Sequence, residues 1–327
     1  MNNALVYMGG LLVVILAALF AVPYFIDWNG YRGVFEEEAS KVLGRDVRVG
    51  GAVNLRLLPT PYVRFEKVRL ADTSGQTGEP FVRADSFTMW LSGPPLLRGV
   101  LEANQVELNR PVLSLVLDGQ GSGNWSDLKI KPGSLPFVPK DVALRSVKLQ
   151  DGAIALYDAQ SQALGRIEAI NGELSADGLS GPYRYKGLAK WGGEEREIKF
   201  ATSPPEASGA FNFKAIIRAT KSISNYAIDG RLDDLSTAPK LTGELTAKLP
   251  MPEAGPVDPK AKPAEPATAE IKSRIAADAL GAKFDDISIA LESAAEPQIV
   301  TGSAQATFTG TPRLDMALAA RDRKSVV

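Results

Sequence analysis

The pattern of hydrophobic and polar positions first marks a long apolar segment at the start of the chain. Residues 1–26 contain no charged side chain, and an apolar stretch runs from Ala4 to Ile26. As a helix, this stretch would be about 34 Å long, enough to cross a hydrocarbon core of about 30 Å. The pattern predicts an N-terminal transmembrane anchor and its exit over residues 1–28. The expected anchoring side chains are Leu11, Val14, Ile15, Leu19 and Trp28.

A cleaved signal peptide is the alternative interpretation of this segment. The segment lacks a charged start, its apolar core is long, and no small-x-small cleavage site precedes Trp28, so an uncleaved anchor is favoured. Arg32, Lys41 and Arg45 follow the segment. A literal positive-inside count would place the body in the cytoplasm, but long domains are translocated largely regardless of such counts.

A helical period follows the anchor and predicts a short amphipathic helix over residues 29–44. Asp27 or Asn29 can cap its start, and Gly44 supplies the stop. We expect its apolar stripe to lie on the membrane surface or to cap the end of the following sheet. The positions that recur with helical spacing are Tyr31, Val34, Phe35, Glu38 and Val42.

From Arg45 onward the period changes to two, which is typical of strands with one buried face. Nothing after this point has the pattern of a long helix, so the predicted fold is mainly β, an elongated curved antiparallel sheet over residues 45–249. Turns are expected at Asp118-Gly119, Asp151-Gly152 and Asn171-Gly172. Besides a first strand to Leu57 and a return from Val63, strands are predicted at 81–91, 100–108, 111–118, 142–149, 153–158, 166–175, 183–190, 195–201, 283–292 and 298–308.

A weak internal repeat supports a sheet that grows by the addition of similar units. Four apolar positions recur 41 residues later along the chain. The two sets are Val106, Leu108, Leu113 and Leu115, and Val147, Leu149, Ile154 and Leu156.

Proline punctuates the last third of the chain. Residues 250–270 contain a proline-rich run that predicts a linker or a long loop. The strand pattern resumes within residues 271–327 and then stops without a closing element, so we expect this last β segment to be incomplete and the parent protein to be longer.

Composition excludes several classes of function. The formal net charge is −1, and no basic run with interleaved aromatic residues is present, so nucleic acid is not an expected partner. The chain has no cysteine and no histidine, which removes thiolate chemistry, the commonest general base and the commonest ligand of transition metals. We therefore expect no enzyme activity, no catalytic residue, no metal and no cofactor.

Two features could still carry chemistry. The glycine-rich run from Gly119 to Gly123 follows a strand, but it lacks the lysine and the helix start of a phosphate-binding loop, so a hairpin turn is the favoured interpretation. An envelope hydrolase would need paired carboxylates in a polar cleft. Clustering of Asp141, Asp151 and Asp158 would favour that alternative.

Several short motifs, in order over residues 4–128, resemble the AsmA family of Gram-negative envelope proteins. They are Asp27-Trp28-Asn29-Gly30-Tyr31-Arg32, Leu43-Gly44-Arg45-Asp46, Leu57-Leu58-Pro59-Thr60-Pro61, Pro95-Leu96-Leu97-Arg98-Gly99, Asn109-Arg110-Pro111 and Gly123-Asn124-Trp125. The resemblance implies a single-pass inner-membrane anchor with the body in the periplasm. It also implies a role in outer-membrane biogenesis, in lipid homeostasis and in outer-membrane protein assembly, and a kinship with bridge-like lipid carriers that have a curved sheet.

The leading hypothesis is therefore a lipid-binding or lipid-bridging groove, with the inner membrane, phospholipid acyl chains and envelope-assembly proteins as partners. The alternative is a structural scaffold whose sheet is a closed core and which docks assembly factors without lipid transfer. Strand phase gives the candidate groove residues Val47, Val49, Val53, Leu55, Leu57, Val106, Leu108, Leu113, Leu115, Val147, Leu149, Ile154 and Leu156.

Overall fold

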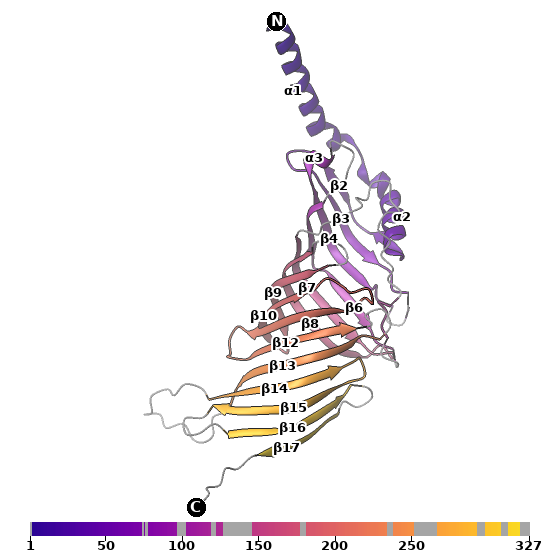
Figure 1. The fold of residues 1–327 in the computed structure, drawn as a ribbon. Coiled ribbons are helices and arrows are strands. Elements are labelled where there is room, and N and C mark those ends of the chain that lie inside the picture. The colour runs from indigo at the N-terminus through magenta and orange to yellow at the C-terminus, as the bar shows by residue number, and fades with distance from the viewer. Residues whose placement is uncertain are drawn as a thin grey trace, which may run out of the picture. The chain divides into compact units, whose positions relative to one another are not determined.

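The computed structural model of the chain is mainly β, as predicted, with seventeen strands among the described residues (Figure 1). The residues group into two compact units. The first comprises residues 1–114, 128–155 and 173–179, and the second comprises residues 115–127, 156–172 and 180–327. The described residues are 2–73, 75, 78–96, 103–118, 122–126, 146–176, 181–233, 238–251, 267–292, 298–308 and 313–320.

The predicted N-terminal helix is present as α1 (Asn2–Phe25). Leu11, Val14 and Ile15 are exposed on it, and the side chain of Leu19 lies outside the described residues. Within the part of the chain that the structure describes, no helix combines the length and the apolar character needed to cross a membrane. The transmembrane anchor is therefore not confirmed and stays a prediction.

The predicted amphipathic helix forms as a short 3₁₀ turn, η1 (Trp28–Tyr31), followed by α2 (Arg32–Leu43). Asp27 caps η1, because its Oδ1 accepts a hydrogen bond from the backbone N–H of Asn29 at 3.0 Å. Gly44 ends α2 in the left-handed conformation, with φ of 69°. The expected stop at Gly44 is thus confirmed, whereas the expected cap lies on η1 and α2 itself begins after Tyr31 without a side-chain cap.

Side chains of α2 bind the backbone of the first strand. Ser40 Oγ accepts a hydrogen bond from the N–H of Val47 at 2.8 Å, and Glu36 Oε1 accepts one from the N–H of Val49 at 2.7 Å. The Phe35 ring packs edge-on against Phe65, with ring centroids 5.2 Å apart. The helix therefore caps this end of the sheet, which was one of its two expected positions.

The strands of the first unit form a mixed sheet. Antiparallel pairs join β1 to β3, β2 to β3, β3 to β4, and β4 to both β5 and β6, whereas β5 and β7 pair in parallel. The prediction of a wholly antiparallel sheet is wrong at this pair. The strands are β1 (Val47–Val49), β2 (Val53–Arg56), β3 (Tyr62–Leu70), β4 (Val82–Leu91), β5 (Ala103–Asn109), β6 (Val112–Val116) and β7 (Val147–Tyr157), and a four-residue helix α3 (Gly93–Leu96) follows β4.

The parallel pair explains the 41-residue repeat. Val106 lies opposite Val147, and Leu108 lies opposite Leu149, so the repeat offset equals the register of the two strands. A parallel pair needs a long connection between its strands, and about thirty residues separate β6 from β7. Similar side chains therefore stack side by side on one face.

Left-handed residues interrupt the strands of this sheet in one row. Lys67 in β3, Arg110 between β5 and β6, and Asp151 in β7 have φ of 52°, 44° and 51°. The registers align these three positions with Asp85 of β4, to which Arg110 Nε donates a hydrogen bond at 2.6 Å. A residue in this left-handed conformation breaks the two-residue alternation of a strand. Side chains on either side of the row therefore lie on the same face when they are an odd number of residues apart.

Two predicted turns prove to be strand interior. Asp151-Gly152 lies within β7, which joins the strands expected at 142–149 and 153–158 into one, and Asn171-Gly172 lies within β8 (Ala163–Ala176). The Asp-Gly signal at 151 marks the left-handed position of the row and not a chain reversal. At the third site, Asp118 N donates to Ser122 O at 2.8 Å, which closes a turn whose Gly119 lies outside the described residues.

The second unit contains a regular antiparallel meander in which each strand pairs with the next. The proline-rich connection joins two neighbouring strands, since Pro250 at the end of β13 lies opposite Thr268 at the start of β14. The strands are β9 (Tyr183–Trp191), β10 (Glu194–Thr202), β11 (Phe211–Ala219), β12 (Asn225–Asp233), β13 (Lys240–Pro250), β14 (Thr268–Ala277), β15 (Gly281–Glu292), β16 (Gln298–Thr307) and β17 (Arg313–Ala320).

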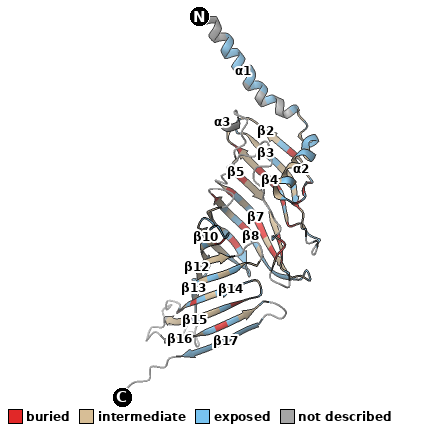
Figure 2. Cartoon of the chain, turned by 45° about the vertical axis from the view of Figure 1, so that its right-hand side comes forward, coloured by how far each residue is buried: buried red, intermediate tan, exposed pale blue. Residues whose placement is uncertain are grey.

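Burial is uneven along the two units (Figure 2). Buried positions are frequent in β4 and β7, whereas every residue of β17 is exposed. Val116, with an exposed fraction of 2%, is the most deeply buried large side chain among the described residues. The packing is therefore that of a sheet with a partly open face more than that of a sealed core.

Candidate functional site

One face of the second unit, here called the apolar face, is built from alternate residues of β9 to β17. Because residues directly opposite each other in an antiparallel pair share a face, the registers assign each side chain to one side. One row across the meander contains Phe213, Gly230, Gly243, Ile275, Phe284, Ala304 and Met316. The next contains Ala215, Ile228, Leu245 and Ser273.

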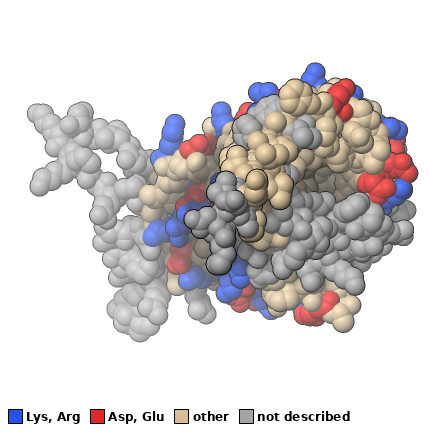
Figure 3. Space-filling model, turned by 90° about the horizontal axis from the view of Figure 1, so that it is seen from above, with Lys and Arg blue, Asp and Glu red and all other residues tan. Residues whose placement is uncertain are grey.

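The other face of the same strands, here called the outer face, is charged. Its side chains form ion pairs such as Lys214–Asp229 (Nζ to Oδ2, 2.6 Å) and Lys199–Glu197 (Nζ to Oε1, 2.8 Å). Surface ion pairs of this kind add little stability, but their charges make the outer face polar and hydrated. Figure 3 shows Lys, Arg, Asp and Glu side chains on the surface of the molecule seen from above. The two faces therefore differ sharply in polarity.

The apolar face is open. Its large side chains, including Phe200, Ile228 and Leu245, are only half-buried, and the buried positions are mostly small residues such as Ala247 and Ala304. A sealed sandwich would reverse this order and bury the largest side chains most deeply. Among the described residues that follow α3, no helix is available to cover the face.

Two neighbouring strands approach each other closely in the middle of the apolar face. Gly230 and Gly243 lie opposite each other, and a Cβ atom on Gly243 would lie 2.4 Å from the carbonyl oxygen of Asp229. The Phe213 ring lies beside Gly230, 3.4 Å from the place of a Cβ atom there. The two glycines therefore present no side chain on this face, and the Phe213 ring covers the backbone that they leave exposed.

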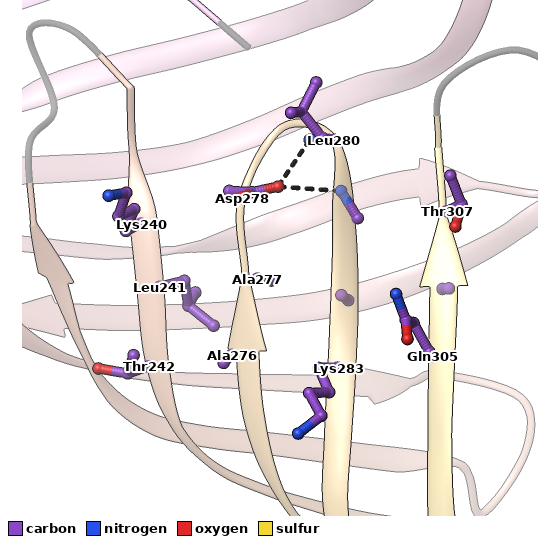
Figure 4. A pocket seen from close by; sticks show the side chains of 13 residues that line it. Lys240, Leu241, Thr242, Ala276, Ala277, Asp278, Leu280, Lys283, Gln305 and Thr307 are labelled. Carbon is purple, nitrogen blue, oxygen red and sulfur yellow. Dashed lines mark hydrogen bonds between the residues drawn. The ribbon is translucent and has the colours of Figure 1, made fainter. Parts of the chain in front are cut away.

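A depression of about 450 Å³ lies at one end of the strands (Figure 4). Ala277, Ala282 and Ala306 are paired in one row, and they leave space beside Leu241. At the turn, Asp278 Oδ1 accepts hydrogen bonds from the N–H groups of Leu280 and Gly281, so this carboxylate holds the backbone and is not turned toward a ligand. Lys240, Lys283 and Gln305 also line the depression, so its polarity is mixed.

Arg196 is the cation that stands on the apolar face between β9 and β17. It lies in phase with Ile198 and Phe200 on β10, and its side chain is 15% exposed. The guanidinium lies 5.5 Å from the ring centroid of Trp191 and 5.9 Å from that of Tyr226. Sequence analysis missed this residue, although a charged side chain at an apolar-phase position is a signal that could have identified it.

A second polar group lies on the same face. The hydroxyl of Tyr185 is buried, and it has no hydrogen-bond partner among the described residues. Burial raises the pKa of this phenol above its ordinary value of 10.0, because the charged form would lose its hydration. The ring stacks on Phe200, with centroids 5.9 Å apart. Tyr185 is therefore a neutral part of the face at physiological pH.

The candidate groove residues of the first unit are brought onto a common face. Val53 and Leu55 lie opposite Phe65 and Val63, and Leu108 lies opposite Phe87. The row of left-handed residues explains why the spacing of five between Leu108 and Leu113, and between Leu149 and Ile154, preserves the face. The described candidates are buried (Val47, Val49, Val53, Val106, Val147) or half-buried (Leu55, Leu57, Leu108, Leu113, Leu149, Ile154 and, in the second unit, Leu115 and Leu156). Their contact with lipid stays a prediction.

The carboxylates considered for hydrolysis do not assemble into a described cluster. Asp158 Oδ1 accepts hydrogen bonds from the N–H groups of Gln160 and Gln162, which closes the turn between β7 and β8. Asp151 is the left-handed residue of β7, and Asp141 lies outside the described residues. Within the described ranges, no group of three acidic side chains could hold a metal ion.

Comparison with known proteins agrees with the motifs read along the chain. The sequence model of the AsmA family matches residues 2–233, which is most of the chain. A search of curated proteins returns no match.

Proposed function

The chain belongs to the AsmA family, and from this membership, which indicates a function related to the cell envelope and the outer membrane, we propose that it binds or bridges lipid through its apolar face. In this proposal acyl chains lie against the half-buried side chains of β9 to β17. The proposal extends to outer-membrane biogenesis and to an influence on outer-membrane protein assembly.

The openness of the apolar face carries this proposal. An exposed face with the polarity of a protein core needs a cover, and a large uncovered apolar patch marks a binding surface. Phe200, Ile228 and Leu245 are half-buried on this face, while the opposite side of the same strands is charged. An acyl chain has the chemistry that completes such a face.

The energetics favour this occupant without any catalytic group. Each methylene moved from water to an apolar surface contributes about 0.8 kcal/mol. About ten buried methylenes would therefore contribute about 8 kcal/mol, the free energy of a micromolar dissociation constant, before ordering costs.

The location belongs to the same proposal. We infer that α1 anchors the protein in the inner membrane and that the body lies in the periplasm. The apolar stretch from Ala4 to Ile26 and the family membership support this inference.

Site-directed photo-crosslinking tests the proposed lipid contact. A photo-crosslinking amino acid replaces Leu245 on the apolar face or Thr246, its neighbour on the outer face of the same strand. Full-length protein in native membranes is irradiated, and adducts are identified by mass spectrometry. We expect lipid adducts at 245 and none at 246.

Two results would contradict the proposal. Equal lipid labelling at both positions would mean non-specific contact, and protein adducts alone at 245 would favour the scaffold alternative, in which the face docks an assembly factor.

A further inference from the structure

The guanidinium of Arg196 occupies an unusual place for a cation. On the apolar face, the paired strands β9 to β17 carry charge only at Arg196 and Glu194, within their described residues. Both lie beside the turn between β9 and β10, at the end of the strands. This position is the margin of the face, where the polar end of a bound lipid could reach water.

The surroundings of Arg196 leave part of its hydrogen-bonding capacity unused. Nη2 is 3.0 Å from Glu194 Oε2, and Glu194 is itself 55% exposed. Nε is buried, and among the described residues it has no hydrogen-bond partner. A buried donor without a partner is costly, so the site favours an additional acceptor.

Aromatic rings fix the orientation of the guanidinium. Trp191 and Tyr226 contact it from two different strands, β9 and β12. Cation–π contacts of this kind hold the planar group in one orientation and limit its access to water. The remaining donors are therefore presented in a fixed fork, which is the geometry that phosphate oxygens accept.

We propose that Arg196 binds the phosphate of a phospholipid whose acyl chains lie along the apolar face. This inference rests on the proposed function. It adds a headgroup preference, since a phosphate monoester or diester would be held at the margin, whereas an uncharged glycerolipid would gain only the acyl contacts. Glu194 competes with the phosphate for Arg196 and weakens its binding.

The test compares two lipids with the same chains, dioleoyl phosphatidic acid and dioleoylglycerol, presented to the full-length protein in the same detergent. Arg196→Gln should weaken phosphatidic acid binding about tenfold and leave dioleoylglycerol unchanged, since one charge-assisted contact is lost. The matched control is Arg218→Gln, on the outer face of β11, and it should bind both lipids as the unmodified protein does.

A second variant keeps the inference testable if Arg196→Gln does not fold. Glu194→Gln removes the competing carboxylate at an exposed position and should strengthen phosphatidic acid binding severalfold, with dioleoylglycerol unchanged. A purely structural role for Arg196 predicts no such gain. Equal changes for both lipids, or no change in either variant, would overturn the headgroup site.

Inorganic phosphate distinguishes the two sources of the same chemistry. We expect it to bind too weakly to compete with phosphatidic acid. Binding of inorganic phosphate that is lost in Arg196→Gln, with no lipid preference, would assign the site to the free ion and overturn the lipid headgroup. Failure of the unmodified protein to bind either lipid would instead overturn the proposed function itself.

Discussion

At the scale of single residues, the left-handed conformations of Lys67, Arg110 and Asp151 determine which side chains share a face. Each lies in or next to a strand, and apolar positions on either side of it are an odd number of residues apart, as with Phe65 and Val68 in β3. Non-glycine residues adopt this conformation at a cost, so the surrounding registers must hold them there. The row therefore keeps apolar side chains on one face although an odd number of residues separates them along the chain.

Substitution of Lys67 tests this role. Lys67→Val should destabilise the protein by about 1–3 kcal/mol, because a β-branched side chain is strained at φ of 52°. Lys67→Gly should be at least as stable as the unmodified protein, because glycine adopts this conformation without strain. Thermal unfolding followed by circular dichroism measures both.

The control for this series lies two residues away in the same strand. Arg69→Val places the same side chain at an exposed position of β3 whose φ is not positive, and it should change stability by less than about 0.5 kcal/mol. If Arg69→Val and Lys67→Val cost the same, the loss at 67 does not come from backbone strain.

At the scale of elements, the pair β12 and β13 shows how small residues shape the apolar face. Gly230 and Gly243 bring the two strands together under Phe213. The same residues weaken the hydrophobic alternation on which strand prediction depends. A segment such as Asn225–Asp233 contains both Asp229 and Gly230, so it reads as a loop until its neighbours are known.

Gly243→Ala should therefore destabilise the protein by about 1–3 kcal/mol, since the new methyl group would overlap the carbonyl oxygen of Asp229. Thr246→Ala, on the outer face of the same strand, is the matched control and should change stability little. The thermal midpoints of the two variants decide the matter. Equal midpoints would mean that the strands can separate without cost.

Sequence predicted some strands of the second unit and missed others, including β11, in which Phe211 and Phe213 alternate clearly with polar residues. The predictions at 183–190 and 195–201 correspond to β9 and β10, and those at 283–292 and 298–308 to β15 and β16, whereas β11 to β14 and β17 were not predicted. The local sequence pattern also could not predict which strands pair with each other. The parallel neighbour of β5 is β7, and only the 41-residue repeat hinted at it.

The candidate site was also predicted only in part. Strand phase placed Val106, Leu108, Val147 and Leu149 on one side, and their pairing agrees with that phase. The larger apolar face of the second unit lies mostly in strands that were not predicted. Arg196 was overlooked because a single arginine in a strand is common on outer faces, although its phase with Ile198 and Phe200 was visible in the sequence; the registers place it on the apolar face.

At the scale of the whole molecule, the role of α1 determines where the apolar face meets lipid. Val14→Asp places a carboxylate near the middle of the apolar stretch. A charge at the centre of a spanning helix costs about 2.5–3.5 kcal/mol on insertion scales, so this change should reduce membrane insertion of the full-length chain. Extraction of membranes with alkaline carbonate, followed by immunoblotting, measures the inserted fraction.

The two possible results imply different arrangements of the protein at the membrane. If the unmodified chain resists carbonate and Val14→Asp is released, α1 spans the membrane and the sheet begins at its surface. Tyr7→Asp, nearer the end of the stretch, should then have a smaller effect, because the cost of a charge falls toward the interface. If carbonate releases the unmodified chain as readily as the variant, α1 does not span, and lipid must reach the apolar face by a peripheral contact.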